Sequence, residues 1–322
     1  MTNEQPSELA ARLQGVFTAL ITPFTAPDAA EVDLDQLAEN IAWQAQAGVT
    51  GVVACGTTGE SPTLNEQEYR AVVERTVKAA RPFELMVIAG AGSNNTDHAV
   101  HMHRFAHAAG AHAALHVTPY YNKPSQRGLY EHFMTIADSC ALPIALYNIP
   151  GRTGVAIEMP TLKRLATHPN IIATKEATGS VGNVSRIVEE TGLVVLSGDD
   201  PLTLPMCSLG ARGVVSVISN IVPADVAAMC RAIEAGDWNR ARQLHQQLLP
   251  LAQGLLTLDT NPIPIKTALA CRDTDTGLLR LPMTPPSDKV YERITQLLRA
   301  YEKSAGVDAS TVEVKQAMPS HA

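Results

Sequence analysis

The stretch that organises this chain is IIATKEATG, residues 171–179, in which an apolar run of strand length ends in Lys175 and a polar, glycine-containing turn follows at once. Burial of a lysine where a strand meets a loop favours the neutral amine, which is the form that attacks carbonyl groups. The alternative is a surface lysine that merely caps a strand. Position alone favours neither interpretation, so the remaining strand ends decide between them.

Seven further apolar runs of similar length occur along the chain. Helical periodicity lies between them, for example at residues 34–46, 66–80, 96–109, 130–140 and 201–209. Strand and helix repeated eight times predict an α/β fold, a (β/α)8 TIM barrel, rather than an open sheet. The predicted strands are Val16–Ile21, Gly51–Ala54, Leu85–Ala89, Ala113–Val117, Ile144–Tyr147, Ile171–Lys175, Val194–Ser197 and Gly213–Val217.

The pattern changes to helices alone after the eighth strand. Helical periodicity covers residues 223–235, 239–256, 264–270 and 286–303, with no strands between them. We therefore expect a catalytic barrel at residues 13–235 and a C-terminal helical appendage at residues 236–303. The polar ends, residues 1–12 and 304–322, are expected to be flexible tails.

Composition excludes several classes of protein. The chain of 322 residues is 45% hydrophobic, and its 25 Lys and Arg against 32 Asp and Glu give a net charge of −7, which argues against a nucleic-acid partner. No apolar run is long enough to cross a membrane and the start lacks the pattern of a signal peptide, so we expect a cytoplasmic protein with no membrane partner. The five cysteines lack paired spacing, which predicts reduced thiols.

Polar motifs follow three other predicted strands. They read GTTGE (residues 56–60), TPYYNKP (residues 118–124) and YNIPGRTG (residues 147–154). The active site of such a barrel is built from the loops at the C-terminal ends of its strands, so these motifs should meet at one rim. The amides and hydroxyls of GTTGE suit a small carboxylate, although an ordinary hydrogen-bonded turn explains that motif equally well by itself.

The chemistry of these groups is consistent. A lysine that forms a Schiff base needs a nearby acid and base to dehydrate the carbinolamine and to move a proton. Tyr147 ends the strand adjacent to the one that ends in Lys175, and Arg152 offers a planar fork suited to a carboxylate. The sequence thus predicts a covalent lysine imine with a carbonyl substrate that carries a carboxylate, with no metal and no other cofactor.

Seven segments of the chain carry a wider pattern: Gly56–Glu60, Val117–Pro124, Tyr147–Gly154, Lys175–Gly179, Ser197–Asp200, Asn261–Pro264 and Leu281–Pro285. In order and in spacing they resemble the dihydrodipicolinate synthase family, from about Gly15 to about Arg299. Membership would imply a synthase that condenses pyruvate with aspartate 4-semialdehyde to 4-hydroxy-tetrahydrodipicolinate, on the route to diaminopimelate and lysine. It would also imply a homotetramer built as a dimer of dimers.

The resemblance also assigns catalytic roles. Lys175 would form the imine with pyruvate, and Tyr147 would donate and accept protons beside it. Thr57 and Tyr121 would complete a hydroxyl relay to solvent, with Tyr121 reaching across a tight dimer interface into the neighbouring site.

The same resemblance assigns substrate-binding roles. Thr58 would bind the pyruvate carboxylate, together with the backbone of Val215, where many relatives carry isoleucine. Gly198 falls in another matching segment and is expected to bind substrate. Arg152 would hold the carboxylate of the aldehyde. Gly151 stands where serine is also common, a change that should leave Arg152 in place.

The nearest alternative is a pyruvate-dependent lyase or aldolase of the same superfamily, acting on sialic acid or a 2-keto-3-deoxy sugar acid with the same lysine and tyrosine. Arg152 and the pair Thr57 and Thr58 resemble the synthase pattern more closely. A non-catalytic protein on a barrel scaffold is a second alternative, which the presence of both Lys175 and Tyr147 disfavours.

A third alternative is a zinc-dependent aldolase, because six histidines crowd one region. Helical spacing puts His103 and His107 on one face, as metal ligands would be. We nevertheless expect this helix on the outside of the barrel, away from the rim and without a converging carboxylate or cysteine. The histidines are His98, His101, His103, His107, His112 and His116.

Overall fold

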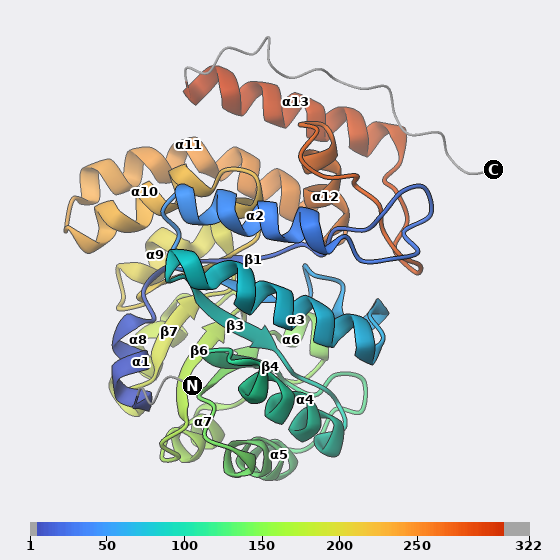
Figure 1. Cartoon of the computed structure of the whole chain (residues 1–322). Coiled ribbons are helices and arrows are strands. Elements are labelled where there is room, and N and C mark those ends of the chain that lie inside the picture. Colours follow the sequence, from blue (N-terminus) through green and yellow to red (C-terminus); the bar gives the residue numbers. More distant parts are fainter. Residues whose placement is uncertain (1–4, 306–322) are drawn as a thin grey trace.

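The computed structural model describes residues 5–305 and shows eight parallel strands in chain order, closed by pairing of β1 with β8 (Figure 1). The predicted (β/α)8 barrel is thereby confirmed. Three predicted strands match to the residue, and the others differ by one or two residues at one or both ends. The strands are β1 (Gly15–Ala19), β2 (Gly51–Ala54), β3 (Met86–Gly90), β4 (Ala113–Val117), β5 (Ile144–Asn148), β6 (Ile171–Glu176), β7 (Val194–Ser197) and β8 (Gly213–Ser216).

Side-chain caps set the ends of the outer helices. The Asp33 carboxylate accepts hydrogen bonds from two backbone amides at the start of α2 (Leu34–Gln46), and Asn65 forms a capping box at the start of α3 (Glu66–Ala80). Both helices, and α4 (Thr96–Ala109), lie where the sequence predicted them. The next helix, α5 (Gln126–Ser139), starts four residues earlier than predicted because Ser125 caps it.

The remaining barrel helices are short. The helix predicted at residues 201–209 is a 3-10 turn, η3 (Asp200–Leu202), followed by only five residues of α-helix in α9. Besides η3, the short elements are α6 (Pro150–Thr153), α7 (Met159–Leu165), α8 (Gly182–Thr191), α9 (Thr203–Cys207), η1 (Ser61–Thr63), η2 (Arg81–Phe83) and η4 (Ile218–Asn220).

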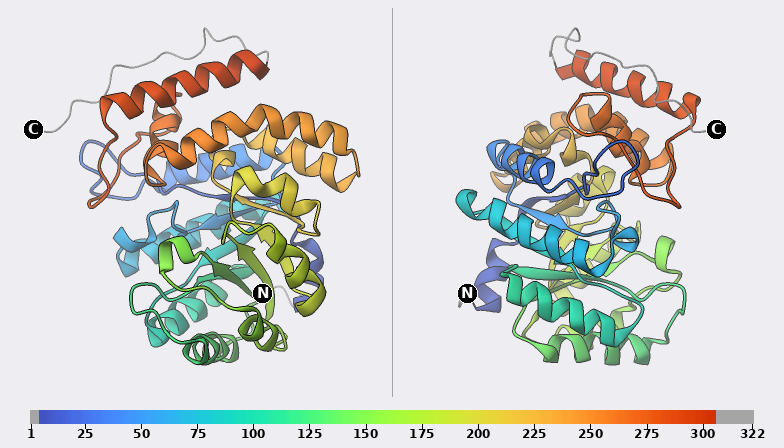
Figure 2. Two further views of the ribbon diagram at one scale, coloured as in Figure 1. Left: turned by 180° about the vertical axis from the view of Figure 1, so that it is seen from behind. Right: turned by 45° about the vertical axis from the view of Figure 1, so that its right-hand side comes forward.

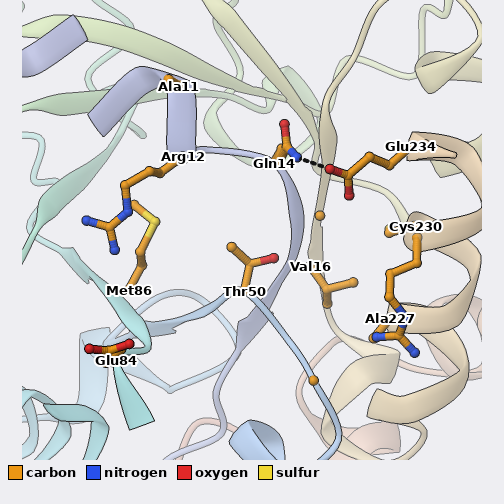
Figure 3. Close-up of a pocket in the computed structure, with 13 residues that line it drawn as sticks. Ala11, Arg12, Gln14, Val16, Thr50, Glu84, Met86, Ala227, Cys230 and Glu234 are labelled. Atoms are coloured by element: carbon orange, nitrogen blue, oxygen red, sulfur yellow. Dashed lines mark hydrogen bonds between the residues drawn. The ribbon is translucent and has the colours of Figure 1, made fainter. Parts of the chain in front are cut away.

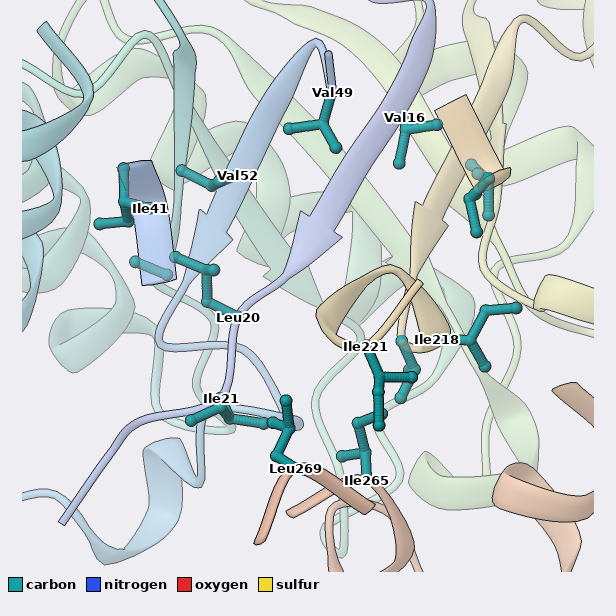
Figure 4. Close-up of a cluster of buried hydrophobic side chains, with 14 of the residues drawn as sticks. Val16, Leu20, Ile21, Ile41, Val49, Val52, Ile218, Ile221, Ile265 and Leu269 are labelled. Atoms are coloured by element: carbon teal, nitrogen blue, oxygen red, sulfur yellow. The ribbon is translucent and has the colours of Figure 1, made fainter. Parts of the chain in front are cut away.

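The last four helices stack beside α2 on one side of the barrel (Figures 1 and 2). An apolar cluster joins them to the strands: Val16 and Val52 of the barrel share it with Ile265 and Leu269 of α12 (Figure 4). Burial of this surface fixes the C-terminal helices against the barrel. They are α10 (Pro223–Glu234), α11 (Trp238–Thr257), α12 (Ile263–Ala270) and α13 (Asp288–Ala305).

The expectation of a flexible tail at residues 1–12 is wrong for its second half. Residues 6–12 form α1 (Pro6–Arg12), and Leu9 and Leu13 are buried in the cluster that fills the barrel interior. The Arg212 guanidinium holds this segment by donating to the carbonyl oxygens of Ala10 (3.2 Å) and Ala11 (2.9 Å). Residues 304 and 305 belong to α13, whereas the tails expected at 1–4 and 306–322 lie outside the described residues.

No helix among the described residues is long and apolar enough to cross a membrane.

Candidate functional site

Lys175 and Tyr147 lie side by side at the rim. They are register partners of the parallel strands β6 and β5, so their side chains point to the same face. The Lys175 Nζ lies over the Tyr147 ring, 4.1 Å from its centroid, and each residue is only 6% exposed. The structure therefore brings together a buried amine and a buried phenol, as the sequence predicted.

Gly198 leaves the space that the lysine side chain occupies. A Cβ at this position would lie 3.1 Å from both Cγ and Cε of Lys175, and 2.7 Å from the Cβ of Ala177. Any larger residue would push against the lysine. The structure thus places Gly198 in contact with Lys175.

The loop after β2 is tightly held. Cys55, which precedes it, and Glu60, which ends it, both adopt the left-handed backbone region, with φ of 52° and 51°. Within it Thr58 is buried, and its hydroxyl accepts a hydrogen bond of 3.0 Å from the Asn261 side-chain amide. Thr57 is half-buried and lines a cavity of about 440 Å³.

Arg152 lies on α6, directly after β5, and lines the same cavity as Thr57. One of its guanidinium nitrogens donates a 3.3 Å hydrogen bond to the Asn261 carbonyl oxygen. Asn261 thus contacts both Thr58 and Arg152, a role that sequence reasoning missed. The segment Asn261–Pro264 is one of the seven matching segments, but no local pattern in the sequence indicates that a residue beyond the barrel reaches the rim.

Val215 is buried on β8, with its side chain in the cluster that fills the barrel. The loop after it is fixed by Asp200, whose carboxylate accepts hydrogen bonds from the backbone amides of Val217 (2.8 Å) and Ile218 (3.3 Å). Burial raises the pKa of Asp200 to about 6. Asp200 is a second positioning group that sequence reasoning did not assign.

Glu176, the residue after Lys175, is also buried. Its Oε1 accepts hydrogen bonds from the backbone amide (3.1 Å) and the hydroxyl of Thr178, which tightens the turn after β6. Burial raises its pKa. The strand end that carries the lysine is therefore followed at once by an anchored turn.

Tyr121 is not brought to the site by its own chain. It is 90% exposed, with a φ of 71° in the left-handed region. The loop that presents it is fixed by two hydrogen bonds, from Asn122 to the Asn94 carbonyl (2.8 Å) and from Asn94 to the Tyr120 carbonyl (3.1 Å). Within the described residues Tyr121 therefore stands out from the barrel on a well-anchored loop.

The His103 and His116 side chains meet on the outer side of the barrel, between α4 and β4. His103 on α4 and His116 on β4 are buried against each other, with 3.0 Å between Nδ1 and Nε2, whereas His107 is exposed. His103 and His107 therefore do not share an inward face. Over residues 5–305, no three His, Cys, Asp or Glu side chains are grouped so that they could hold a metal ion.

A second cavity, of about 430 Å³, opens at the opposite, N-terminal ends of β1 and β2 (Figure 3). Its lining includes Arg12, Glu84, Arg231 and Glu234, all of them exposed. Catalytic groups of (β/α)8 barrels come from the other end, so we assign the site to the Lys175 rim.

Comparison with known proteins agrees with this geometry. The Dihydrodipicolinate synthetase family profile matches residues 12–301. The chain is 48% identical over 288 residues to the 4-hydroxy-tetrahydrodipicolinate synthase of Methanothrix thermoacetophila, covering 88% of this chain and 96% of that protein. The crystal structure of the Aquifex aeolicus dihydrodipicolinate synthase is similar with a TM-score of 0.87, at 45% identity, over 90% of this chain and 98% of that one. A structure described as a monomeric dihydrodipicolinate synthase variant matches with a TM-score of 0.86 at 36% identity, over 91% and 98% of the two chains.

Fold and rim together define a (β/α)8 barrel enzyme. The chain belongs to the dihydrodipicolinate synthetase family. The synthase interpretation of the sequence is confirmed, and the lyase or aldolase alternative is not favoured.

Proposed function

We propose that the enzyme condenses pyruvate with aspartate 4-semialdehyde through an imine on Lys175, giving 4-hydroxy-tetrahydrodipicolinate in the cytoplasm. The observation that carries this proposal is the contact between the buried Lys175 amine and the Tyr147 ring, 4.1 Å from Nζ to centroid. Such a pair supplies a nucleophile and a proton-transfer group at one point of the rim.

The steps follow from this arrangement. The Lys175 amine attacks the ketone carbon of pyruvate, and the carbinolamine loses water after proton transfer through Tyr147. Loss of a methyl proton gives an enamine, whose carbon attacks the aldehyde of the second substrate. The amino group of that substrate then displaces Lys175 from the imine carbon, which closes the ring and frees the enzyme. The balance is one water released for each pair of substrates.

Two neighbouring groups suit the two carboxylates. Thr58 is buried in the loop after β2, and its hydroxyl and the amides of that loop would hold the carboxylate of pyruvate, with the Val215 backbone and Gly198 completing that side. Arg152 lines the same cavity as Thr57, and its fork would hold the carboxylate of aspartate 4-semialdehyde.

The position of Tyr121 leads us to include an oligomer in the proposal. A tyrosine that is 90% exposed on an anchored loop cannot complete a relay with Thr57 and Tyr147 in its own barrel. A second copy packed face to face would receive it, so we expect a tight dimer, paired again into a homotetramer. Light scattering checks the assembly, and a fully active monomer would contradict this role for Tyr121.

The central test is borohydride trapping with pyruvate, followed by peptide mass mapping. We expect a reduced adduct on Lys175 and none in Lys175→Ala, because Lys175 supplies the amine that lies against Tyr147. Lys163→Ala, which only breaks an exposed 3.1 Å ion pair with Glu190, should trap pyruvate like wild type. An adduct on another lysine, or no adduct, would overturn the mechanism.

A further inference from the structure

A buried ion pair joins the C-terminal helical region to the loop that carries Thr58. The Lys266 side chain on α12 is fully buried, and its Nζ lies 2.6 Å from Oε1 of Glu60, whose side chain is 2% exposed. The same Nζ donates to the Leu278 carbonyl oxygen at 2.7 Å and lies 4.0 Å from the centroid of the Phe24 ring. The amine is therefore enclosed by groups from three separate parts of the chain.

Glu60 is fixed from a second side. Its Oε2 accepts a 3.1 Å hydrogen bond from the backbone amide of Arg280. The Arg280 guanidinium in turn forms an ion pair with Glu68 of α3 at 2.6 Å and contacts the face of the Phe24 ring. Both carboxylate oxygens of Glu60 are thus held by residues that follow α11.

The pair acts on the loop through the backbone. Glu60 has a φ of 51°, and its amide donates to the carbonyl oxygen of Thr57, closing the turn that presents Thr57 and Thr58. A non-glycine residue keeps a left-handed backbone only where its surroundings hold it there. From the same segment of chain, Asn261 donates to the Thr58 hydroxyl.

A buried ion pair is weak evidence of stabilisation, because desolvation offsets most of the attraction between the charges. Its directional bonds, however, fix the geometry of what it connects. We infer that Lys266 is a positioning residue: through Glu60 it holds the Gly56–Glu60 loop in the arrangement that binds the carboxylate of pyruvate. This inference rests on the carboxylate-binding role proposed above for Thr58, and it makes the helical region at residues 236–303 a part of the substrate site.

The test measures KM for pyruvate, kcat and the melting temperature in Lys266→Met and in Glu60→Gln. We expect KM for pyruvate to rise about tenfold in each variant, with a smaller change in kcat, because misplacement of a binding group by a fraction of an ångström weakens binding. The matched control is Arg272→Met. It breaks the 3.0 Å ion pair with the buried Glu302 and the 2.9 Å hydrogen bond to the Ile221 carbonyl oxygen, and both partners lie outside the Gly56–Glu60 loop.

A role confined to stability predicts a different pattern. Lys266→Met and Arg272→Met would then lose a similar amount of melting temperature and would have the same KM for pyruvate. This result would overturn the inference. The double variant Lys266→Met with Glu60→Leu removes both charges, so its melting temperature should recover while KM stays high. Recovery of both quantities would also overturn it.

Glu60→Gln keeps the shape of the side chain and keeps the test decisive if Lys266→Met does not fold. Failure of the proposed function is visible separately, since wild type would then form no pyruvate adduct, and the present inference would fall with it. The positioning role alone would be wrong if wild type traps pyruvate and Thr58→Val raises KM for pyruvate, but Glu60→Gln leaves that KM unchanged.

Discussion

The two ends of the barrel bury different kinds of side chain. At the C-terminal rim Lys175, Glu176, Thr58 and Asp200 are each no more than 6% exposed. At the N-terminal end, α1 and the residue after it bury the apolar side chains of Leu9 and Leu13. The charged residues that line the second cavity there are exposed. Burying polar groups costs free energy unless each finds a partner, so a fold tolerates them where they serve a reaction. The same eight strands thus carry chemistry at one end and stability at the other.

The largest effect is expected from Tyr147→Phe, which tests whether the C-terminal rim carries the chemistry. Loss of the hydroxyl should lower kcat by about 10²- to 10⁴-fold, the usual contribution of a general acid or base, and should slow imine formation as well. The melting temperature should hardly change, because the ring that packs against Lys175 remains. Steady-state rates and single-turnover trapping check this, with Tyr130→Phe on α5 as the control. Wild-type turnover in Tyr147→Phe would remove the tyrosine from the mechanism.

Three buried histidines extend the comparison of the two ends, because these polar side chains lie on the outer side of the strands and at neither end of the barrel. Burial lowers the pKa of His103 and of His132 to about 4, and it also lowers that of His116. The unfolded chain therefore binds protons more tightly, so these groups contribute stability that is present above pH 6.5 and lost as the pH falls toward 4, on the order of 3 kcal/mol for each of the first two.

Asp200 and Asp275 oppose this effect in the same pH range, because burial raises the pKa of each to about 6 and protonation then favours the folded state. The His103→Gln variant separates the two contributions. Urea unfolding between pH 6.5 and 4 should show wild type losing more stability than His103→Gln. Parallel pH profiles for the two proteins would contradict a buried neutral His103.

At the N-terminal end, Leu9→Ala should lower the free energy of unfolding by about 2 to 3 kcal/mol, at the lower end of the range for buried leucines because α1 is peripheral. The value of kcat/KM at 25 °C should stay within twofold of wild type. Denaturant titration and steady-state assays measure both. A rate loss larger than the stability loss explains would show that the two ends are coupled.

The smallest expected effect comes from Gly198→Ala. The added Cβ would press on Lys175 and Ala177, so kcat/KM should fall about tenfold through displacement of the amine. Gly182→Ala at the start of α8 is the matched control, because a Cβ there meets nothing within 4 Å. Equal activities in the two variants would mean that the site tolerates movement of the lysine.

The sequence was sufficient for whatever depends on neighbouring residues or neighbouring strands. The apolar runs located all eight strands, and adjacency of two strands was enough to pair Tyr147 with Lys175. The contacts of Asn261 with Thr58 and of Lys266 with Glu60 join residues more than 200 positions apart, and no local pattern announces them. The helix at Pro6–Arg12 escaped for the same reason: it is too short to show periodicity, and its burial depends on docking beneath strands formed much later in the chain.

The docking of α1 limits the order in which parts of the chain can fold. Its carbonyl oxygens at Ala10 and Ala11 are bound by Arg212, and β1 completes its pairing only with β8. The segment around α1 must therefore wait for some two hundred further residues before it meets Arg212 and β8. Until the later strands are made, Leu9 and Leu13 remain exposed apolar surface, the kind of surface that makes a partly folded chain prone to aggregation.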